Sequence, residues 1–329
     1  MADADSLDRN LALEAVRTTE ITALAASGLT GRGDEKAADQ AAVNAMRQTL
    51  KDVAIHGTVV IGEGERDKAP MLYIGEEVGG GGSPVDIAVD PLEGTTITAK
   101  GGQNALAVMA MADPGGLLNA PDIYMDKIAV GGDLPEGVVD LDAEPAANLR
   151  ALAKAKNTEV EDLVVCILDR PRHSEIIQKV REAGARVMLI ADGDIAGVIA
   201  TTRYSAGVDL YMGIGGAPEG VLAAAALRCI GGQMQGRLSF RKEGHRERAE
   251  RWGITDFDRT YSLAELAGGD VIFAATGVTD GTMLRGVRRH GGFAQTHSVV
   301  MRSRTGTIRL IEADHNLGRK PAADPERSR

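Results

Sequence analysis

The sequence has few of the residues that mark several classes of protein. Its only two cysteines, Cys166 and Cys229, lie far apart in apolar surroundings. This spacing excludes a disulfide framework and a CxxC metal knuckle, and it favours two buried free thiols in a reducing compartment. Aromatic residues make up only 3% of the chain, so platforms for base stacking are not expected.

An excess of positive charge and long apolar runs are also missing. The 329 residues include 37 Lys and Arg against 47 Asp and Glu, and the resulting formal net charge of −10 argues against nucleic-acid and anionic-membrane partners. The longest apolar stretches, such as 105–112 and 221–227, fall short of the ~20 residues that span a bilayer. The N-terminus is acidic where a secretory signal needs basic residues and an apolar core, so a cytoplasmic location is expected.

Several common catalytic and nucleotide-binding motifs are absent. The six histidines show no HxH, HExxH or paired spacing, and each is expected at the surface or in a loop rather than as a ligand. The sequence contains no GxSxG elbow and no P-loop. The segment Gly213-Ile-Gly-Gly-Ala-Pro-Glu-Gly220 begins like a dinucleotide fingerprint, but Pro218 stands where the third glycine or alanine is needed. A dinucleotide site is therefore not favoured.

Apolar periodicity predicts an alternation of strands and helices. Glycine is abundant, with 41 residues, and these glycines belong in turns and backbone-lined sites. The predicted helices cover 7–24, 37–50, 173–183 and 221–228. The predicted strands cover 58–61, 85–90, 104–111, 163–168, 186–190 and 208–212. This alternation favours a mostly parallel layered sheet, with a charged loop or helix over 237–251 and a frayed tail over 320–329.

Carboxylates gather where the predicted strands end. Glu63 directly follows one strand, Asp90 is the last residue of another, and Glu93 comes three residues later. Pro91 should stop the strand and enforce a turn in which the side chains of Asp90 and Glu93 converge. Acids gathered without His or Cys suit Mg²⁺ or Mn²⁺ better than Zn²⁺. Any single acid here is more often a solvated turn residue, but the hexapeptide 90–95 as a whole favours a functional site.

This hexapeptide, Asp-Pro-Leu-Glu-Gly-Thr, resembles the D-P-[IL]-[DE]-G-[ST] metal motif of the lithium-sensitive phosphatase superfamily, which includes inositol monophosphatases and fructose-1,6-bisphosphatases. From about Leu11 to about Arg319, the chain resembles class II fructose-1,6-bisphosphatase more specifically. The segments that carry this resemblance are 31–34, 38–39, 42–47, 60–65, 69–76, 119–122 and 213–220. An inositol-phosphate phosphatase is less favoured, because the similarity outside the hexapeptide is to the bisphosphatases.

The resemblance implies the architecture. We expect a layered αβαβα sandwich of the sugar-phosphatase type, with two lobes and the active site between them. The N-terminal lobe, 1–155, would carry most metal ligands, and the C-terminal lobe, 156–329, would carry the substrate-binding strand ends. A symmetric homo-oligomer, either a dimer or a tetramer, is also expected.

The resemblance also implies the site residues. Family metal ligands match Asp39 and Glu63 for one ion of Mn²⁺ or Mg²⁺, and Asp90, Glu93 and Glu219 for others. Substrate contacts match Glu93, Gly94, Thr95, Tyr124, Arg170, Pro171, Arg172, Asp192, Gly193, Asp194 and Gly216. Lys36 stands near the position where the family often has a lysine, and it is a candidate for a phosphate contact.

The implied chemistry assigns a role to each group. Thr95 would orient the attacking water, and Glu63 or Asp67 would take its proton. Two arginines after one strand would hold the distal phosphate by charge-assisted hydrogen bonds, and two aspartates after the next would accept hydrogen bonds from sugar hydroxyls. These residues are Arg170, Arg172, Asp192 and Asp194.

The expected reaction is hydrolysis of the 1-phosphate of fructose 1,6-bisphosphate to fructose 6-phosphate and phosphate, in gluconeogenesis or the Calvin cycle. Sedoheptulose-1,7-bisphosphatase activity, alone or alongside it, stays open because both sugars carry a 1-phosphate and a second phosphate at the far end. A non-catalytic sugar-phosphate sensor is the alternative from another class. The five predicted metal-ligating acids argue against it, because a binder of anions has little use for them.

Overall fold

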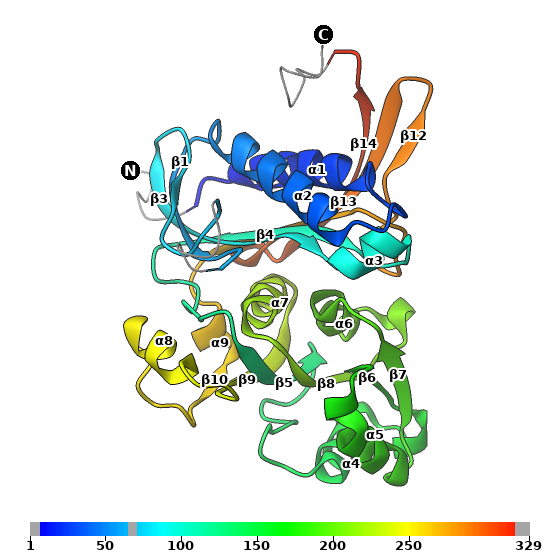
Figure 1. Cartoon of the computed structure of the whole chain (residues 1–329). Coiled ribbons are helices and arrows are strands. Elements are labelled where there is room, and N and C mark those ends of the chain that lie inside the picture. The colour runs from blue at the N-terminus through cyan, green and yellow to red at the C-terminus, as the bar shows by residue number, and fades with distance from the viewer. Residues whose placement is uncertain (1–6, 65–70, 320–329) are drawn as a thin grey trace.

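The computed structural model describes residues 7–64 and 71–319, whose strands form two mixed sheets (Figure 1). Among these residues, the larger sheet has eight strands in the order β12-β13-β11-β4-β3-β1-β2, with β14 beside β13. Its strands are β1 (Ile55–Ile61), β2 (Glu77–Val78), β3 (Ser83–Glu93), β4 (Leu106–Ala112), β11 (Val271–Gly277), β12 (Arg288–His290), β13 (Phe293–Arg302) and β14 (Thr307–Asn316).

The smaller sheet has six strands within the described residues, in the order β10-β9-β5-β8-β6-β7. They are β5 (Tyr124–Gly131), β6 (Val164–Leu168), β7 (Arg186–Ile190), β8 (Leu210–Gly216), β9 (Gly232–Ser239) and β10 (Thr260–Ser262). The helices are α1 (Leu11–Ser27), α2 (Glu35–Leu50), α3 (Thr95–Lys100), α4 (Pro145–Lys156), α5 (Ser174–Glu182), α6 (Asp194–Ala200), α7 (Ala217–Ile230), α8 (His245–Arg251) and α9 (Leu263–Leu266).

The helices and sheets are stacked in alternating layers. Helices α1 and α2 cover the outer face of the larger sheet, α6 and α7 lie between the sheets, and α4 and α5 cover the outer face of the smaller sheet (Figure 1). Helix α7 contacts strands of both sheets, and its residues 220–227 are buried on every side. A helix that is apolar all round belongs in a core. The predicted layered αβαβα sandwich is confirmed.

The prediction of a mostly parallel sheet is wrong. Among the described strands, only the β1–β3, β6–β7 and β6–β8 pairs are parallel, and the other pairs are antiparallel. Hydrophobic periodicity reports the type of an element but not its direction, which depends on how its neighbours pair. Short connections such as β13–β14 favour antiparallel neighbours, because a parallel pair needs a longer crossover.

Pro91 does not end its strand as predicted. β3 continues through it to Glu93, and the pairing with β4 shifts register between Asp90 and Glu93. A β-bulge tolerates a proline, because the extra residue is already left out of the hydrogen-bond ladder. The strand therefore bends at Pro91 without stopping.

The predicted lobe division, 1–155 and 156–329, stays a prediction, and its boundary falls in the last turn of α4. The larger sheet takes its strands from 55–112 and 271–316, and the smaller sheet takes them from 124–262. Both cysteines are buried free thiols, as expected. None of the described helices combines the length and the apolar character needed to cross a membrane.

Enlarging a small residue of α7 should destabilise the fold. Ala224 is fully buried between the two sheets, so Ala224→Leu should lower the free energy of unfolding by about 1–3 kcal/mol through overpacking. Urea denaturation followed by circular dichroism measures this change. Arg228→Ala, at an exposed position of the same helix, is the control and should leave the midpoint in place. An unchanged midpoint for Ala224→Leu would contradict the enclosure of α7.

Candidate active site

A cavity of about 880 Å³ lies where strands of both sheets end. Its lining includes Asp90 of β3 and Glu63 from the loop after β1. It also includes Tyr124 and Gly216 of the smaller sheet and Glu219 of α7. These residues are far apart in the sequence, and folding brings them to one cavity. The structure therefore joins predicted metal ligands and predicted substrate contacts at one place.

The bulge in β3 places two of the acids on the same face of the sheet. Asp90 lies opposite Val108 and Glu93 lies opposite Leu106, and these two β4 residues share a face because they are two positions apart. In a regular strand, acids three positions apart would point to opposite faces. The extra residue at the bulge thus produces the convergence that was predicted from a turn.

Acids from separate segments raise one another's pKa around the cavity. Burial raises the pKa of Glu63 to about 8, and the charges of Asp39, Asp122 and Glu219 add to the shift. Burial also raises the pKa of Asp90 well above its usual range, again with Glu219, Glu63 and Asp39 contributing. Burial raises the pKa of Glu219 itself to about 7. Without a cation, these groups resist ionisation at neutral pH.

Glu93 is the most enclosed of the predicted ligands. Its side chain belongs to a residue that is 4% exposed, and Oε1 accepts a hydrogen bond from the backbone N–H of Ile195 at 2.9 Å. Oε2 is buried and has no hydrogen-bond partner among the described residues. Burial raises the pKa of Glu93 well above its usual range, and the charges of Asp90 and Asp194 add to it. A buried oxygen left without a partner is costly, so this atom is suited to a bound cation.

The donor set fits a hard divalent cation. The predicted ligands offer only carboxylate oxygens, the ligand type that Mg²⁺ and Mn²⁺ prefer. Within the described ranges, no three His, Cys, Asp or Glu side chains are already close enough to hold an ion together. The carboxylates are nevertheless near enough to shift one another's pKa, and one buried oxygen has no partner. Their side chains would therefore have to draw together as an ion binds.

The predicted catalytic threonine follows directly after this acid pair. Gly94 has a φ of 93°, a left-handed conformation that glycine adopts without strain, and it turns the chain from β3 into α3. Thr95 is the first residue of α3 and is half-buried. Asp39 is half-buried on α2, which packs against α3. Asp67, the other predicted proton acceptor, lies outside the described residues.

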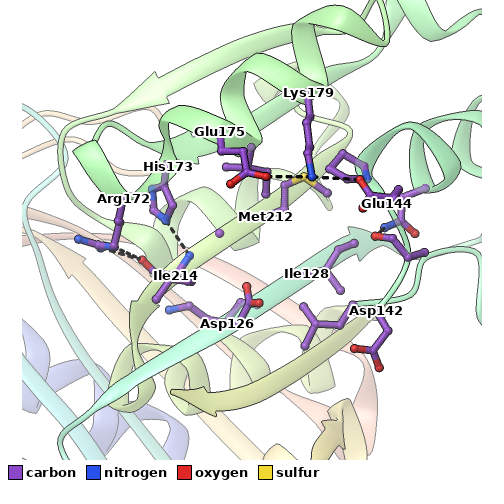
Figure 2. Close-up of a pocket in the computed structure, with 17 residues that line it drawn as sticks. Asp126, Ile128, Asp142, Glu144, Arg172, His173, Glu175, Lys179, Met212 and Ile214 are labelled. Carbon is purple, nitrogen blue, oxygen red and sulfur yellow. Dashed lines mark hydrogen bonds and ion pairs between the residues drawn. The ribbon is translucent and has the colours of Figure 1, made fainter. Parts of the chain in front are cut away.

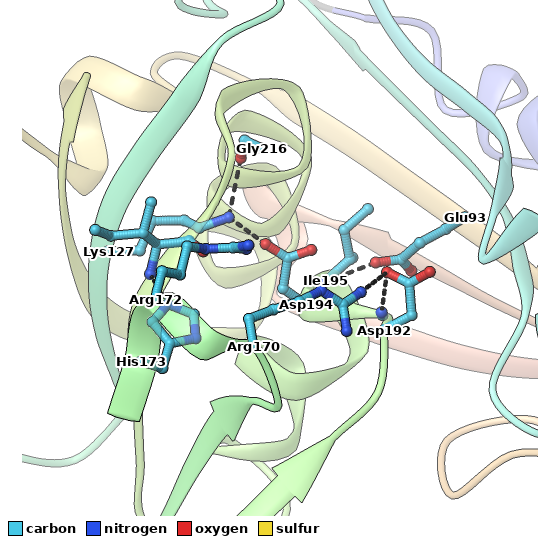
Figure 3. A network of polar contacts seen from close by, with 11 residues as sticks. Glu93, Lys127, Arg170, Arg172, His173, Asp192, Asp194, Ile195 and Gly216 are labelled. Atoms are coloured by element: carbon cyan, nitrogen blue, oxygen red, sulfur yellow. Dashed lines mark hydrogen bonds and ion pairs between the residues drawn. The ribbon is translucent and has the colours of Figure 1, made fainter. Parts of the chain in front are cut away.

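The predicted phosphate-binding arginines already have partners in the protein. The Nε and Nη2 atoms of Arg172 donate to the backbone oxygen of Ile214 at 2.9 and 2.7 Å. The guanidinium carbon lies 4.9 Å from the centre of the Tyr124 ring, in a cation–π contact. Arg170 lies 3.9 Å from the carboxylate of Asp192, and both of these side chains are more than one third exposed (Figure 3). The arginines and Asp192 therefore lie on the smaller sheet's side of the site.

The expectation that every histidine lies at the surface or in a loop is wrong for three of them. His173, His245 and His315 are 1%, 6% and 8% exposed. The Nε2 atom of His173 accepts a hydrogen bond from the backbone N–H of Ile214 at 2.8 Å, so the proton must be on Nδ1, which donates to the oxygen of Leu168 at 2.7 Å. His173 thus has a structural role, and sequence spacing did not reveal it.

The burial of His173 has a cause in the sheet. β6 and β8 pair only at Val165–Leu210 and Cys166–Tyr211. On the side of β8 that faces β6, the backbone of Ile214 therefore lies beyond the last strand pair. Arg172 and His173, both in a 3₁₀ turn over Pro171–His173, replace the missing strand by binding the oxygen and the N–H of that residue (Figure 2). They also line a separate cavity of about 320 Å³ between the smaller sheet and α4 and α5.

Sequence reasoning missed Lys127 of β5. This residue is 1% exposed, its Nζ forms an ion pair with Asp194, and it donates to the oxygen of Gly216 at 2.9 Å (Figure 3). A lysine next to Asp126, directly before the apolar residues 128–130, was the available signal. Asp194 is itself 5% exposed, so Asp192 is the better placed of the two for a sugar hydroxyl.

The charged segment 237–251 also contributes residues to the lining of the site. Residues 237–239 belong to β9, so the prediction of a loop or helix is wrong for them, and it holds for the residues that follow, of which 245–251 form α8. Lys242, His245 and Arg248 line the 880 Å³ cavity, as does Asp122, which was not assigned a role. The cavity thus has both acidic and basic walls.

The metal-free protein should lose stability as the pH rises. Glu63 holds its proton more tightly in the folded state, with a pKa of about 8 against an ordinary value of 4.5. Its contribution to stability is therefore complete below about pH 4.5 and is lost as the pH rises through about 8. In EDTA, the Tm should fall between about pH 6 and pH 8, and saturating Mg²⁺ or Mn²⁺ should restore much of it.

Circular dichroism melts across this range measure the effect. Glu63→Gln cannot ionise at this position and should show a smaller fall in Tm. Glu265→Gln is the control, because hydrogen bonds lower the pKa of Glu265 to about 2 and it stays ionised throughout. A wild-type Tm that is independent of pH in EDTA would contradict the assignment.

The chain is similar to known proteins over nearly its whole length. Residues 9–315 match the family described as bacterial fructose-1,6-bisphosphatase, glpX-encoded. A fructose-1,6-bisphosphatase 1 class 2 of Escherichia coli (strain K12) is 48% identical over 332 residues, which cover 97% of this chain and 98% of that protein. Proteins of two Synechococcus strains, JA-3-3Ab and JA-2-3B'a(2-13), are named D-fructose 1,6-bisphosphatase class 2/sedoheptulose 1,7-bisphosphatase. Both are 45% identical, over 335 and 336 residues that cover 94% of this chain and 96% of each relative.

This family implies dependence on a divalent metal ion, in agreement with the oxygen-only donor set. The match extends across both sheets and every predicted metal ligand in the described residues. The chain therefore belongs to the glpX-type bacterial fructose-1,6-bisphosphatase family and is a phosphoric monoester hydrolase.

Proposed function

We propose that this enzyme hydrolyses the 1-phosphate of fructose 1,6-bisphosphate, using Mg²⁺ or Mn²⁺, to give fructose 6-phosphate and phosphate. The observation that carries the proposal is the group of acids that share one region and raise one another's pKa. Protons or cations must neutralise such a group, and a phosphate ester could not approach it otherwise. The relatives named for this activity add support.

Five residues would hold the cations. They are Asp39 and Glu63 for one ion, and Asp90, Glu93 and Glu219 for others. When bound, a divalent cation neutralises charge on phosphoryl oxygens and lowers the pKa of water. The unpartnered Oε2 of Glu93 and the raised pKa of Glu63 and Glu219 support this assignment.

The remaining chemistry is positioning and proton transfer. Thr95 can donate and accept through its hydroxyl, so it would orient the attacking water in line with the phosphorus. Glu63 would accept the proton of this water, with Asp67 as a second member of the relay. Glu63 is suited to this role because its environment already favours a bound proton near neutral pH.

The smaller sheet would supply the contacts to the sugar and its second phosphate. Arg170 and Arg172 carry charge that can hold the distal phosphate, next to the Tyr124 ring. Asp192 would accept hydrogen bonds from sugar hydroxyls. The other proposed contacts come from Glu93, Gly94, Pro171, Gly193 and Gly216, and Asp194 is considered separately below.

A second activity, on sedoheptulose 1,7-bisphosphate, is favoured by one observation. Two relatives that are 45% identical to this chain are named for both activities. The comparison of kcat/KM for the two purified sugar esters decides between one substrate and two. We also propose a cytoplasmic dimer or tetramer and membership of the lithium-sensitive superfamily. Light scattering and inhibition by Li⁺ test the oligomer and the superfamily.

Removing a cation-binding charge should nearly abolish turnover. Asp90→Asn and Glu219→Gln keep the shape of each side chain but weaken its hold on a cation, so kcat should fall by about 100-fold or more. Phosphate release in saturating Mn²⁺ measures the loss, and circular dichroism checks the fold. Asp314→Asn changes an exposed acid on β14 and should leave kcat unchanged. Near-normal rates for both site variants would refute the metal assignment.

Arg172 should distinguish a bisphosphate from a monophosphate. Arg172→Ala removes a charged donor, so KM for fructose 1,6-bisphosphate should rise about 10-fold or more. KM for fructose 1-phosphate, which lacks the distal group, should change much less. Arg181→Ala, at an exposed position of α5, is the control. Equal effects on both substrates would remove Arg172 from the distal-phosphate site.

A further inference from the structure

Lys127 is a buried cation beside the acid group. The residue is 1% exposed, and Figure 3 shows its Nζ between the carboxylate of Asp194 and the backbone oxygen of Gly216. Removing two opposite charges from water carries a large desolvation cost, which their attraction offsets only when the geometry is good. A buried ion pair is therefore weak evidence for stability, and its position in the site suggests another role.

The pair connects the segments that carry two predicted metal ligands. Asp194 is the first residue of α6, and the next residue, Ile195, donates its backbone N–H to Oε1 of Glu93 at 2.9 Å. Gly216 immediately precedes α7, and Glu219 lies in the first turn of that helix. Lys127 thus links β5 to the segments that hold Glu93 and Glu219.

The glycines of the 213–220 segment make room for this arrangement. A Cβ atom on Gly215 would lie 2.1 Å from Oδ2 of Asp194 and 2.8 Å from Nζ of Lys127. A Cβ atom on Gly216 would lie 1.8 Å from Oε2 of Glu219. Both distances to Gly215 are too short for any side chain, and the two groups that would have to move are buried and paired. These two positions therefore require glycine for a steric reason that is unrelated to dinucleotide binding.

We propose that Lys127 and Asp194 are a positioning pair, seated against Gly215, that fixes Glu93 and Glu219 for divalent-cation binding. This inference rests on the proposed metal-dependent function. In this proposal Asp194 positions Glu93 through the backbone N–H of Ile195, in place of the predicted contact with a sugar hydroxyl. It also explains why a lysine stands on the face of β5 that is directed at α7.

The first test removes the cation and then both charges. In Lys127→Met, Asp194 is left buried without its cationic partner, so this variant changes both the pairing and the local charge. A loss of metal affinity that persists in the double variant, whose pair has the same net charge as the wild-type pair, reports lost positioning. The double variant Lys127→Met/Asp194→Asn removes both charges and keeps both side-chain shapes, so it should recover Tm relative to the single variant.

Binding of Mn²⁺ to the metal-free full chain, without substrate, is the readout. Calorimetry and the EPR signal of free Mn²⁺ should show affinity about 10- to 100-fold weaker than wild type in both the single and the double variant. Gly215→Ala should copy this loss by displacing the pair. Lys156→Met breaks the Lys156–Asp209 ion pair elsewhere in the molecule and should bind Mn²⁺ like wild type.

The outcomes separate the two proposals. Wild-type affinity in the folded double variant would show that the pair only compensates its own buried charge, and it would overturn the inference while leaving the proposed function intact. An equal loss in Lys156→Met would also overturn it. If the wild-type chain binds neither Mn²⁺ nor Mg²⁺, the proposed function fails, and the inference fails with it. If Lys127→Met does not fold, the double variant and Gly215→Ala still decide the question.

Discussion

Repulsion among buried carboxylates is the constraint on which the site depends. Folding brings Asp39, Glu63, Asp90, Glu93 and Glu219 together from α2, the end of β1, β3 and α7. Burial raises the pKa of each of these acids, and for Glu63, Asp90 and Glu93 the charges of the neighbouring acids add to the shift. In the proposed function, a divalent cation would replace these protons and turn an unfavourable cluster into a binding site. Metal affinity and the stability of this region are therefore thermodynamically linked.

The architecture holds these acids through its backbone. The bulge at Pro91 turns Glu93 to the face of Asp90, and the start of α7 presents Glu219 at the end of the smaller sheet. Because α7 is enclosed by both sheets, its first turn cannot move independently of the core. Rigid placement of this kind suits a reaction in which catalysis consists largely of alignment and charge stabilisation.

Much of this could be predicted from the sequence, because periodicity and the hexapeptide 90–95 are local signals. They located four of the nine helices and six of the fourteen strands in the part of the chain that the structure describes, and they located the acids of β3. The bulge could not be predicted, because it is defined by the pairing of β3 with β4. His173 and Lys127 were missed for a related reason, since their partners are distant in the chain. Asp194, for example, is 67 positions from Lys127.

The glycine-rich segment after β8 shows how one pattern can have two physical causes. Glycines at a helix start can let a backbone approach a phosphate, which is the physical basis of the dinucleotide fingerprint that this segment resembles at its start. In this fold, Gly215 makes room for the Lys127–Asp194 pair, and a Cβ atom on Gly213 would lie 3.0 Å from Nε2 of His173. His173 adjoins Arg172, so the segment contacts the proposed positioning pair through one glycine and the neighbour of a proposed phosphate contact through the other. A side chain at either position would therefore displace one of these buried groups, and this steric reason for glycine does not depend on a nucleotide.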